Sequence, residues 1–125
     1  QLQGQALAPV GGHGGSAPHL ATDVTVVQAH FVLALQTIVA RRLDPRVPAV
    51  VSITQFNAGS TNNVIPPRAH LRGTARCLDA HSRDEIERLV TEICTSVAAA
   101  HGVEVVYRDP GARAVAVALG DERLP

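Results

Sequence analysis

The pattern of apolar and polar positions divides the chain into strands and helices. Residues 68–78 alternate strictly between small or apolar side chains and polar ones, which predicts a strand with one buried face and one basic, solvent-facing side. Residues 49–57 are rich in Val, Ile, Thr and Phe and predict another strand. Residues 103–107 form a third, residues 1–8 resemble a short strand, and residues 114–119 are expected to fold back as an additional one.

Two segments have the signals of helices. Asp23 can cap a helix that runs to about Arg42. A second helix is expected to begin at Ser82, because Ser82 and Glu85 have the spacing of a capping box, and to stop at Gly102. The order β-α-β-β-α-β predicts an α+β fold: a two-layer, ferredoxin-like sandwich of an antiparallel sheet with both helices on one face.

The two predicted helices differ in their apolar surfaces. The second helix has one apolar stripe, which the sheet alone would cover. The first helix has a broad stripe and, nearly opposite, a second stripe formed by Val26, Ala29, Leu33 and Ala40. Scattered apolar residues on a surface are common, so this stripe is also compatible with ordinary surface. The sharper interpretation is a dimer interface with a second copy about a two-fold axis.

Composition and charge narrow the class of protein. The chain has 125 residues, the size of one domain, and 46% of them are hydrophobic, which is enough for a core. Eleven basic and eleven acidic residues cancel, so we expect no nucleic-acid partner and no anionic membrane partner. No apolar run is expected to approach the roughly 20 residues that span a bilayer. Two cysteines, Cys77 and Cys94, make no disulfide framework and fit a reducing cytoplasm.

Candidate chemistry is concentrated at a few polar positions. Glycines on both sides of His13 free the backbone to present the imidazole, although such a segment by itself is better interpreted as a flexible turn. Asn63 and Arg76 carry an amide and a guanidinium that can jointly hold a carboxylate, although Arg76 alone would be taken for a solvated side chain. The six histidines have no ligand spacing, and no metal site is predicted within the chain.

Four segments in a fixed order carry a family resemblance: GGHGGSAPH at 11–19, LQTIVARRLDP at 35–45, AGSTNNVIP at 58–66 and RGTAR at 72–76. Together they resemble the dimerisation, or lid, domain of the zinc metallopeptidases and amidohydrolases. That family includes aminoacylase, hippurate hydrolase, the auxin-conjugate hydrolases and carboxypeptidase G. On this resemblance, residues 1–125 are a single lid domain cut from a larger metallohydrolase, with the last 18 residues unassigned.

The resemblance implies roles for three residues. His13 would reach into the active site of the partner subunit in a homodimer and stabilise the oxyanion, while Asn63 and Arg76 would hold the substrate, Arg76 through its carboxylate. Two zinc or similar divalent ions and the general base are implied for the catalytic domain of the parent chain, so this chain alone is expected to be inactive. The substrate would be an N-acyl amino acid or a peptide.

A different class of function stays open from the sequence. A free-standing α/β sandwich that binds a small ligand or a protein partner would have the same order of elements. RNA binding on the open sheet face is disfavoured, because such sheets stack bases on aromatic side chains and this chain has two Phe and one Tyr.

Overall fold

The computed structural model describes the backbone of residues 2–7, 12–13, 19, 23–108 and 115–117, and the side chains of residue 19 and residues 23–105.

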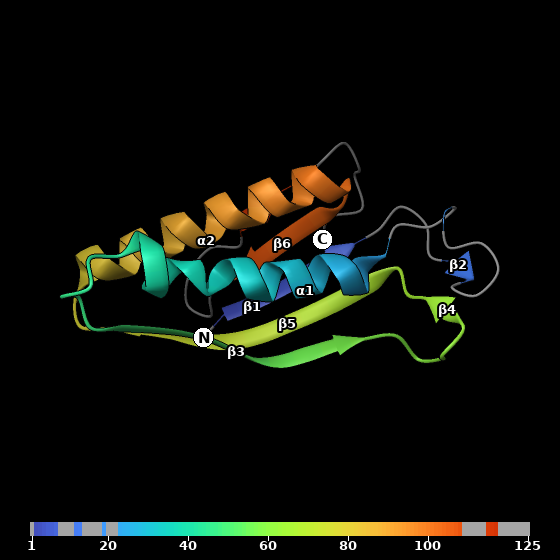
Figure 1. The fold of residues 1–125 in the computed structure, drawn as a ribbon, viewed down its shortest axis with the longest axis horizontal. Helices are drawn as coiled ribbons and strands as arrows, with labels where there is room; N and C mark the ends of the chain where they lie inside the picture. The colour runs from blue at the N-terminus through green and yellow to red at the C-terminus, as the bar shows by residue number, and fades with distance from the viewer. Residues whose placement is uncertain (1, 8–11, 14–18, 20–22, 109–114, 118–125) are drawn as a thin grey trace.

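These residues form a two-layer α+β sandwich, as the sequence predicts (Figure 1). The main sheet has the strand order β3-β5-β1-β6-β7, and every neighbouring pair is antiparallel. Helices α1 and α2 lie side by side on one face of it. The elements of the sandwich are β1 (Leu2–Leu7), α1 (Val24–Leu35), β3 (Ala49–Ala58), β5 (Arg68–Cys77), α2 (Ala80–His101), β6 (Glu104–Arg108) and β7 (Val115–Val117). A second, two-stranded sheet pairs β2 (Gly12–His13) with β4 (Val64–Ile65).

Strand β5 shows how the alternating sequence becomes a layered fold. Ala69, Leu71 and Gly73 are buried beneath the helices, whereas Arg68 and Arg72 are exposed on the opposite face. Since successive side chains of a strand point to opposite faces, this alternation fixes which side of the sheet the helices cover. The core between the layers contains one stripe from each helix: Val24, Val27, Phe31 and Leu35 from α1, and Ile86, Leu89, Val90 and Ile93 from α2.

The first helix is not continuous to Arg42. Helix α1 ends at Leu35, and a π-helical segment, η2 (Ile38–Arg42), follows it. The Thr37 hydroxyl donates to the Ala34 carbonyl at 2.6 Å, and such local side-chain bonds compete with the regular helical pattern. The wider turn closes where the Leu43 amide donates to the Ile38 carbonyl at 2.9 Å.

The prediction that Ser82 caps the second helix is wrong. Asp79 is the N-cap, and its carboxylate accepts a hydrogen bond of 2.7 Å from the Ser82 amide. Ser82 lies inside the first turn, where it is buried. Its amide is one of the free donors of that turn, and Asp79 caps it. The predicted stop is confirmed, because Gly102 ends the helix with φ of 65° in the left-handed region, where a glycine has no Cβ to clash.

The expectation about apolar runs also needs correction. Val24–Arg42, with 19 residues and a mean hydropathy of 1.4, is long and apolar enough to cross a membrane by length and composition alone. A core helix meets the same test, and here the apolar side chains of Val24, Val27 and Phe31 are buried against the sheet and α2. These buried side chains account for part of the hydropathy of this segment, and the rest comes from apolar side chains that are exposed, such as Val26 and Leu33.

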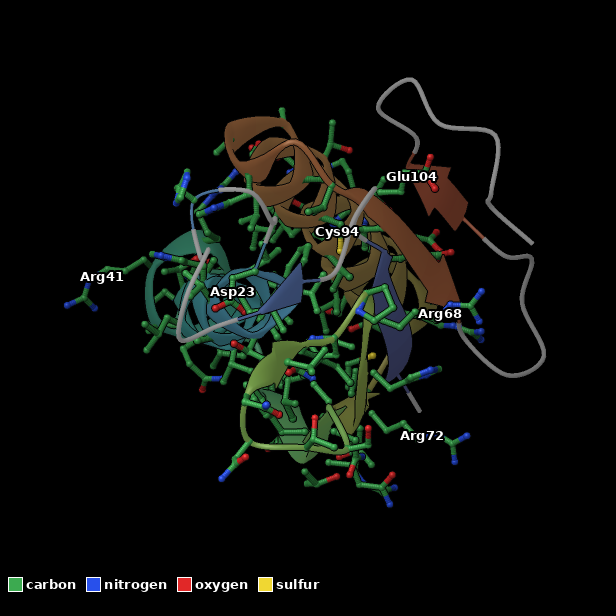
Figure 2. The ribbon with its side chains drawn as sticks, turned by 90° about the vertical axis from the view of Figure 1, so that its right-hand side faces the viewer. Asp23, Arg41, Arg68, Arg72, Cys94 and Glu104 are labelled. Carbon is green, nitrogen blue, oxygen red and sulfur yellow. The ribbon has the colours of Figure 1, made fainter. Side chains whose placement is uncertain are left out.

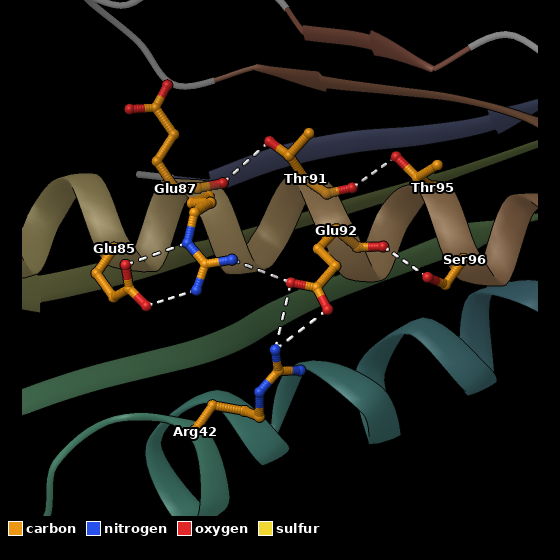
Figure 3. A network of polar contacts seen from close by, with 8 residues as sticks. Arg42, Glu85, Glu87, Thr91, Glu92, Thr95 and Ser96 are labelled. Carbon is orange, nitrogen blue, oxygen red and sulfur yellow. Dashed lines mark hydrogen bonds and ion pairs between the residues drawn. The ribbon is translucent and has the colours of Figure 1, made fainter.

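An ionic network on the surface joins the two helical segments (Figure 3). Arg42 of η2 donates to both carboxylate oxygens of Glu92 at 3.1 and 3.2 Å. Arg88 bridges Glu92 and Glu85 along α2. The partners are substantially exposed, so the network adds little stability.

Candidate functional site

The small β2-β4 sheet brings two of the sequence motifs together. His13 pairs with Val64, and Gly12 pairs with Ile65, in antiparallel register. The backbone of His13 therefore lies beside Val64, the residue that follows Asn63. The side chain of Asn63 is exposed. Figure 1 shows this sheet at one end of the molecule, beyond the ends of β3 and β5. The side chain of His13, whose presentation by the flanking glycines was predicted, is outside the part of the chain whose side chains the structure describes.

Arg76 lies near the opposite end of strand β5, where it pairs with Val50 of β3. Its side chain is exposed on the face away from the helices. Figure 2 shows Arg68 and Arg72, which share this face, extending away from the helical layer. Arg76 lies seven positions along β5 from Ala69, the first residue after the loop with Asn63 that pairs with β3, and at ~3.3 Å per residue this separation is about 23 Å. Within one chain, the structure does not bring Arg76 to His13 and Asn63.

The second stripe of the first helix is exposed. Val26 and Leu33 are 47% and 68% exposed, and together with Thr25, Ala29 and His30 they line a shallow hollow on the outside of α1. Ala40 is also exposed, but it lies in the π-helical segment and does not line the hollow. The edge strand nearest to α1 is β3, so an edge that pairs with no other strand in the described part of the chain adjoins this apolar surface.

Other candidate groups provide little chemistry of their own. Cys94 lies between the layers (Figure 2), and burial raises the pKa of its thiol to about 12, which keeps it protonated at neutral pH and unsuited to act as a nucleophile. The rings of His30 and His101 lie 4.9 Å apart between the two helices. Among the described residues, no three His, Cys, Asp or Glu side chains are grouped so that they could hold a metal ion. The described residues thus do not fit a zinc centre.

Sequence reasoning missed one residue near the His13 and Asn63 end of the molecule, Gln28. It stands on the apolar stripe that faces the core and is 1% exposed. Its side-chain amide donates to the backbone carbonyls of Asn57 and His70 at 3.2 and 2.7 Å. A polar residue on a predicted core face was the available signal, because buried polar groups normally have a specific partner.

Comparisons with known proteins agree with the motifs. A family described as the peptidase dimerisation domain matches residues 9–102. Hippurate hydrolase of Campylobacter jejuni is 42% identical over 95 residues, which are 76% of this chain and 24% of that protein. N-acyl-L-amino acid amidohydrolase of Geobacillus stearothermophilus is 39% identical over 106 residues, 84% of this chain and 28% of that protein.

Solved structures show the same similarity in three dimensions. A putative aminohydrolase from methicillin-resistant Staphylococcus aureus superposes with a TM-score of 0.81 at 33% identity, covering 86% of this chain and 28% of that one. A hydantoinase/carbamoylase family amidase from Burkholderia ambifaria gives 0.75 at 28% identity, covering 86% of this chain and 26% of that one. The chain spans about a quarter of the length of the curated relatives described here. On its motifs, its fold and these matches, the chain belongs to the peptidase dimerisation domain family found in amidohydrolases such as hippurate hydrolase.

Proposed function

We propose that this chain is the lid and dimerisation domain of a metal-dependent N-acyl amino acid amidohydrolase or peptidase, and that its residues complete active sites housed elsewhere. The relatives named as hippurate hydrolase and N-acyl-L-amino acid amidohydrolase support an amide substrate that carries a free carboxylate. Divalent ions that activate the attacking water would belong to the catalytic domain of the parent protein.

The observation that carries the proposal is the pairing of His13 with Val64. This ladder holds the glycine-flanked histidine next to Asn63 at one end of the domain. The imidazole of a histidine whose backbone is held here could donate a hydrogen bond to the oxygen that becomes negative when water attacks the amide carbonyl. Asn63, exposed beside it, can hold the acyl or carboxylate group of the same substrate by its side-chain amide.

Arg76 would serve a different active site from His13 and Asn63. An arginine side chain reaches several ångströms, far less than the roughly 23 Å between Ala69 and Arg76 along β5. A homodimer reconciles these roles, because one lid can give its histidine to the neighbouring active site while its arginine binds the substrate carboxylate in its own. The dimer contact would use the exposed stripe of Val26, Ala29, Leu33 and Ala40, together with the adjoining edge of β3.

The test is a His13→Ala substitution in the full-length parent protein, assayed with an N-acyl amino acid. Loss of one oxyanion donor lowers kcat by about 10²–10³, and we expect such a fall with an unchanged metal content. His19→Ala is the matched control, since His19 lies in the same glycine-rich segment and is exposed. Normal turnover of the His13→Ala protein would remove the proposed role.

A further inference from the structure

Gln28 occupies an unusual place for a polar residue. It lies in the middle of α1 on the face that contains Val24, Val27 and Phe31, and its side chain is almost fully buried. Its Nε2 atom donates two hydrogen bonds, whereas its Oε1 atom is buried without a hydrogen-bond partner. A buried amide that is satisfied at one end only is costly, so this side chain serves the two carbonyls that it contacts.

Those two carbonyls belong to opposite strands at the base of a loop. Asn57 of β3 and His70 of β5 face each other in the antiparallel register, and only the pair Ala58 and Ala69 follows before the loop of residues 59–67 begins. Gln28 thus joins the helical layer to both strands at once, at the point where they leave the body of the sandwich.

Strand β3 has little apolar packing at this end of the sheet, whereas Ala69 and Leu71 of its partner β5 are buried beneath the helices. Every residue of β3 from Thr54 to Ala58 is exposed, in contrast to the buried Val51 earlier in the strand. The loop beyond them carries Asn63 and strand β4, which pairs with His13. The two hydrogen bonds of Gln28 therefore fix the exposed end of β3, and the loop that follows it, against α1, in addition to the packing of β5.

We infer that Gln28 is a positioning residue, whose two hydrogen bonds to the Asn57 and His70 carbonyls hold the loop of residues 59–67, and through it His13 and Asn63, in place against the substrate. This inference rests on the proposed function of His13 and Asn63. Gln28 touches no substrate in this role, so its effect on the reaction passes through the loop.

The main test replaces Gln28 by Met, which keeps the volume and apolar fit but removes both donors. In the full-length parent protein, Gln28→Met is expected to speed amide hydrogen exchange in residues 58–67, where all residues but Pro66 and Pro67 have an amide hydrogen, and to lower kcat/KM about tenfold. Gln36→Met is the matched control. Gln36 is exposed at the end of the same helix, and its side-chain amide donates only to the Val32 carbonyl within the helix. Neither readout should move in that control.

A double substitution separates positioning from general destabilisation. If Gln28 acts through His13, adding Gln28→Met to a His13→Ala protein lowers kcat by no more than about twofold further, because the two changes remove the same interaction. Full additivity of the two losses, or unchanged exchange in residues 58–67, would overturn the inference. The exchange measurement decides it even if His13→Ala alone leaves turnover intact, a result that would contradict only the proposed function.

A second variant covers the case in which Gln28→Met does not fold. Gln28→Glu keeps the shape of the side chain, and its carboxyl group can donate one hydrogen bond only when protonated. Burial raises the pKa of such a carboxyl group, so activity relative to the wild-type protein is expected to rise as the pH is lowered. A ratio that does not change with pH would count against the inference.

Discussion

At the scale of single residues, Gly73 has the least room of the glycines whose surroundings the structure describes. It lies on β5, between two neighbouring strands, and pairs with Leu2 of β1 and Ile53 of β3. A Cβ added there would stand 2.0 Å from the Ser52 carbonyl oxygen and 3.0 Å from the Ile53 Cα. Both are backbone atoms of a paired strand, next to the irregular register between Ile53 and Gln55, so they have little freedom to move.

We therefore expect Gly73→Ala to lower the free energy of unfolding by more than about 2 kcal/mol, because the strand pair must separate to admit the methyl group. Urea denaturation of the chain measures this. Thr74→Ala, at the next position of the same strand, should change it by less than about 1 kcal/mol. A Gly73→Ala protein as stable as the wild type would show that β3 and β5 tolerate a wider separation.

At the scale of elements, the start of α2 depends on one carboxylate. The hydrogen bond from the Ser82 amide, and further bonds from Ser82 and His81, hold the pKa of Asp79 below its ordinary value of 3.8. Because the folded-state pKa is lowered, the contribution of this cap is present above about pH 3.8 and is lost as the pH falls through the lowered pKa.

Asp79→Ala is thus expected to lower the melting temperature by a few degrees at neutral pH. Asp79→Asn should keep most of the cap, since Asn is a comparable N-cap residue, and should lose less stability than the wild type on acidification. Thermal circular dichroism at several pH values distinguishes the three proteins. An Asp79→Ala protein that melts like the wild type would return the capping role to Ser82.

The exposed apolar face of α1 leads to a prediction about the association of two copies. Leu33 is the most exposed large hydrophobic side chain of that face, and a carboxylate there would have to be buried if a second copy packs on it. Leu33→Glu should therefore turn dimers into monomers in sedimentation velocity runs. Glu87→Lys on the other helix is a control for a change of charge and should leave the association unchanged. Leu33→Glu dimers of wild-type stability would mean that the contact lies elsewhere.

At the scale of the whole molecule, the two ends of β5 define the architecture of the proposed active sites. With His13 acting on the neighbouring site and Arg76 on its own, a mixed dimer of a His13→Ala subunit and an Arg76→Ala subunit retains one complete site. Mixing two nearly inactive full-length proteins under conditions that exchange subunits should restore up to half of the wild-type activity per dimer. No recovery despite exchange would show that both residues act on one site.

The periodic parts of the fold could be predicted from the sequence because they depend on short-range rules. The alternation over residues 68–78 identified the buried and exposed faces of β5, and Gly102 marked the end of α2. The order of elements then left few ways to layer them, so the α+β sandwich followed. The family motifs, too, are local in sequence, and the comparisons confirm the resemblance they carry.

The arrangement of the candidate site residues could be predicted from the sequence only in part. Three features of the site depend on how strands and helices pack. They are the pairing of His13 with Val64, the two hydrogen bonds of Gln28 and the distance between Arg76 and Asn63. Likewise, only the packed helix shows that Asp79 caps it while Ser82 is buried. The sequence by itself determined the elements and their order, since periodicity and turn chemistry are properties of neighbouring residues. Tertiary structure decided which ends of those elements meet, because that depends on contacts between residues far apart along the chain.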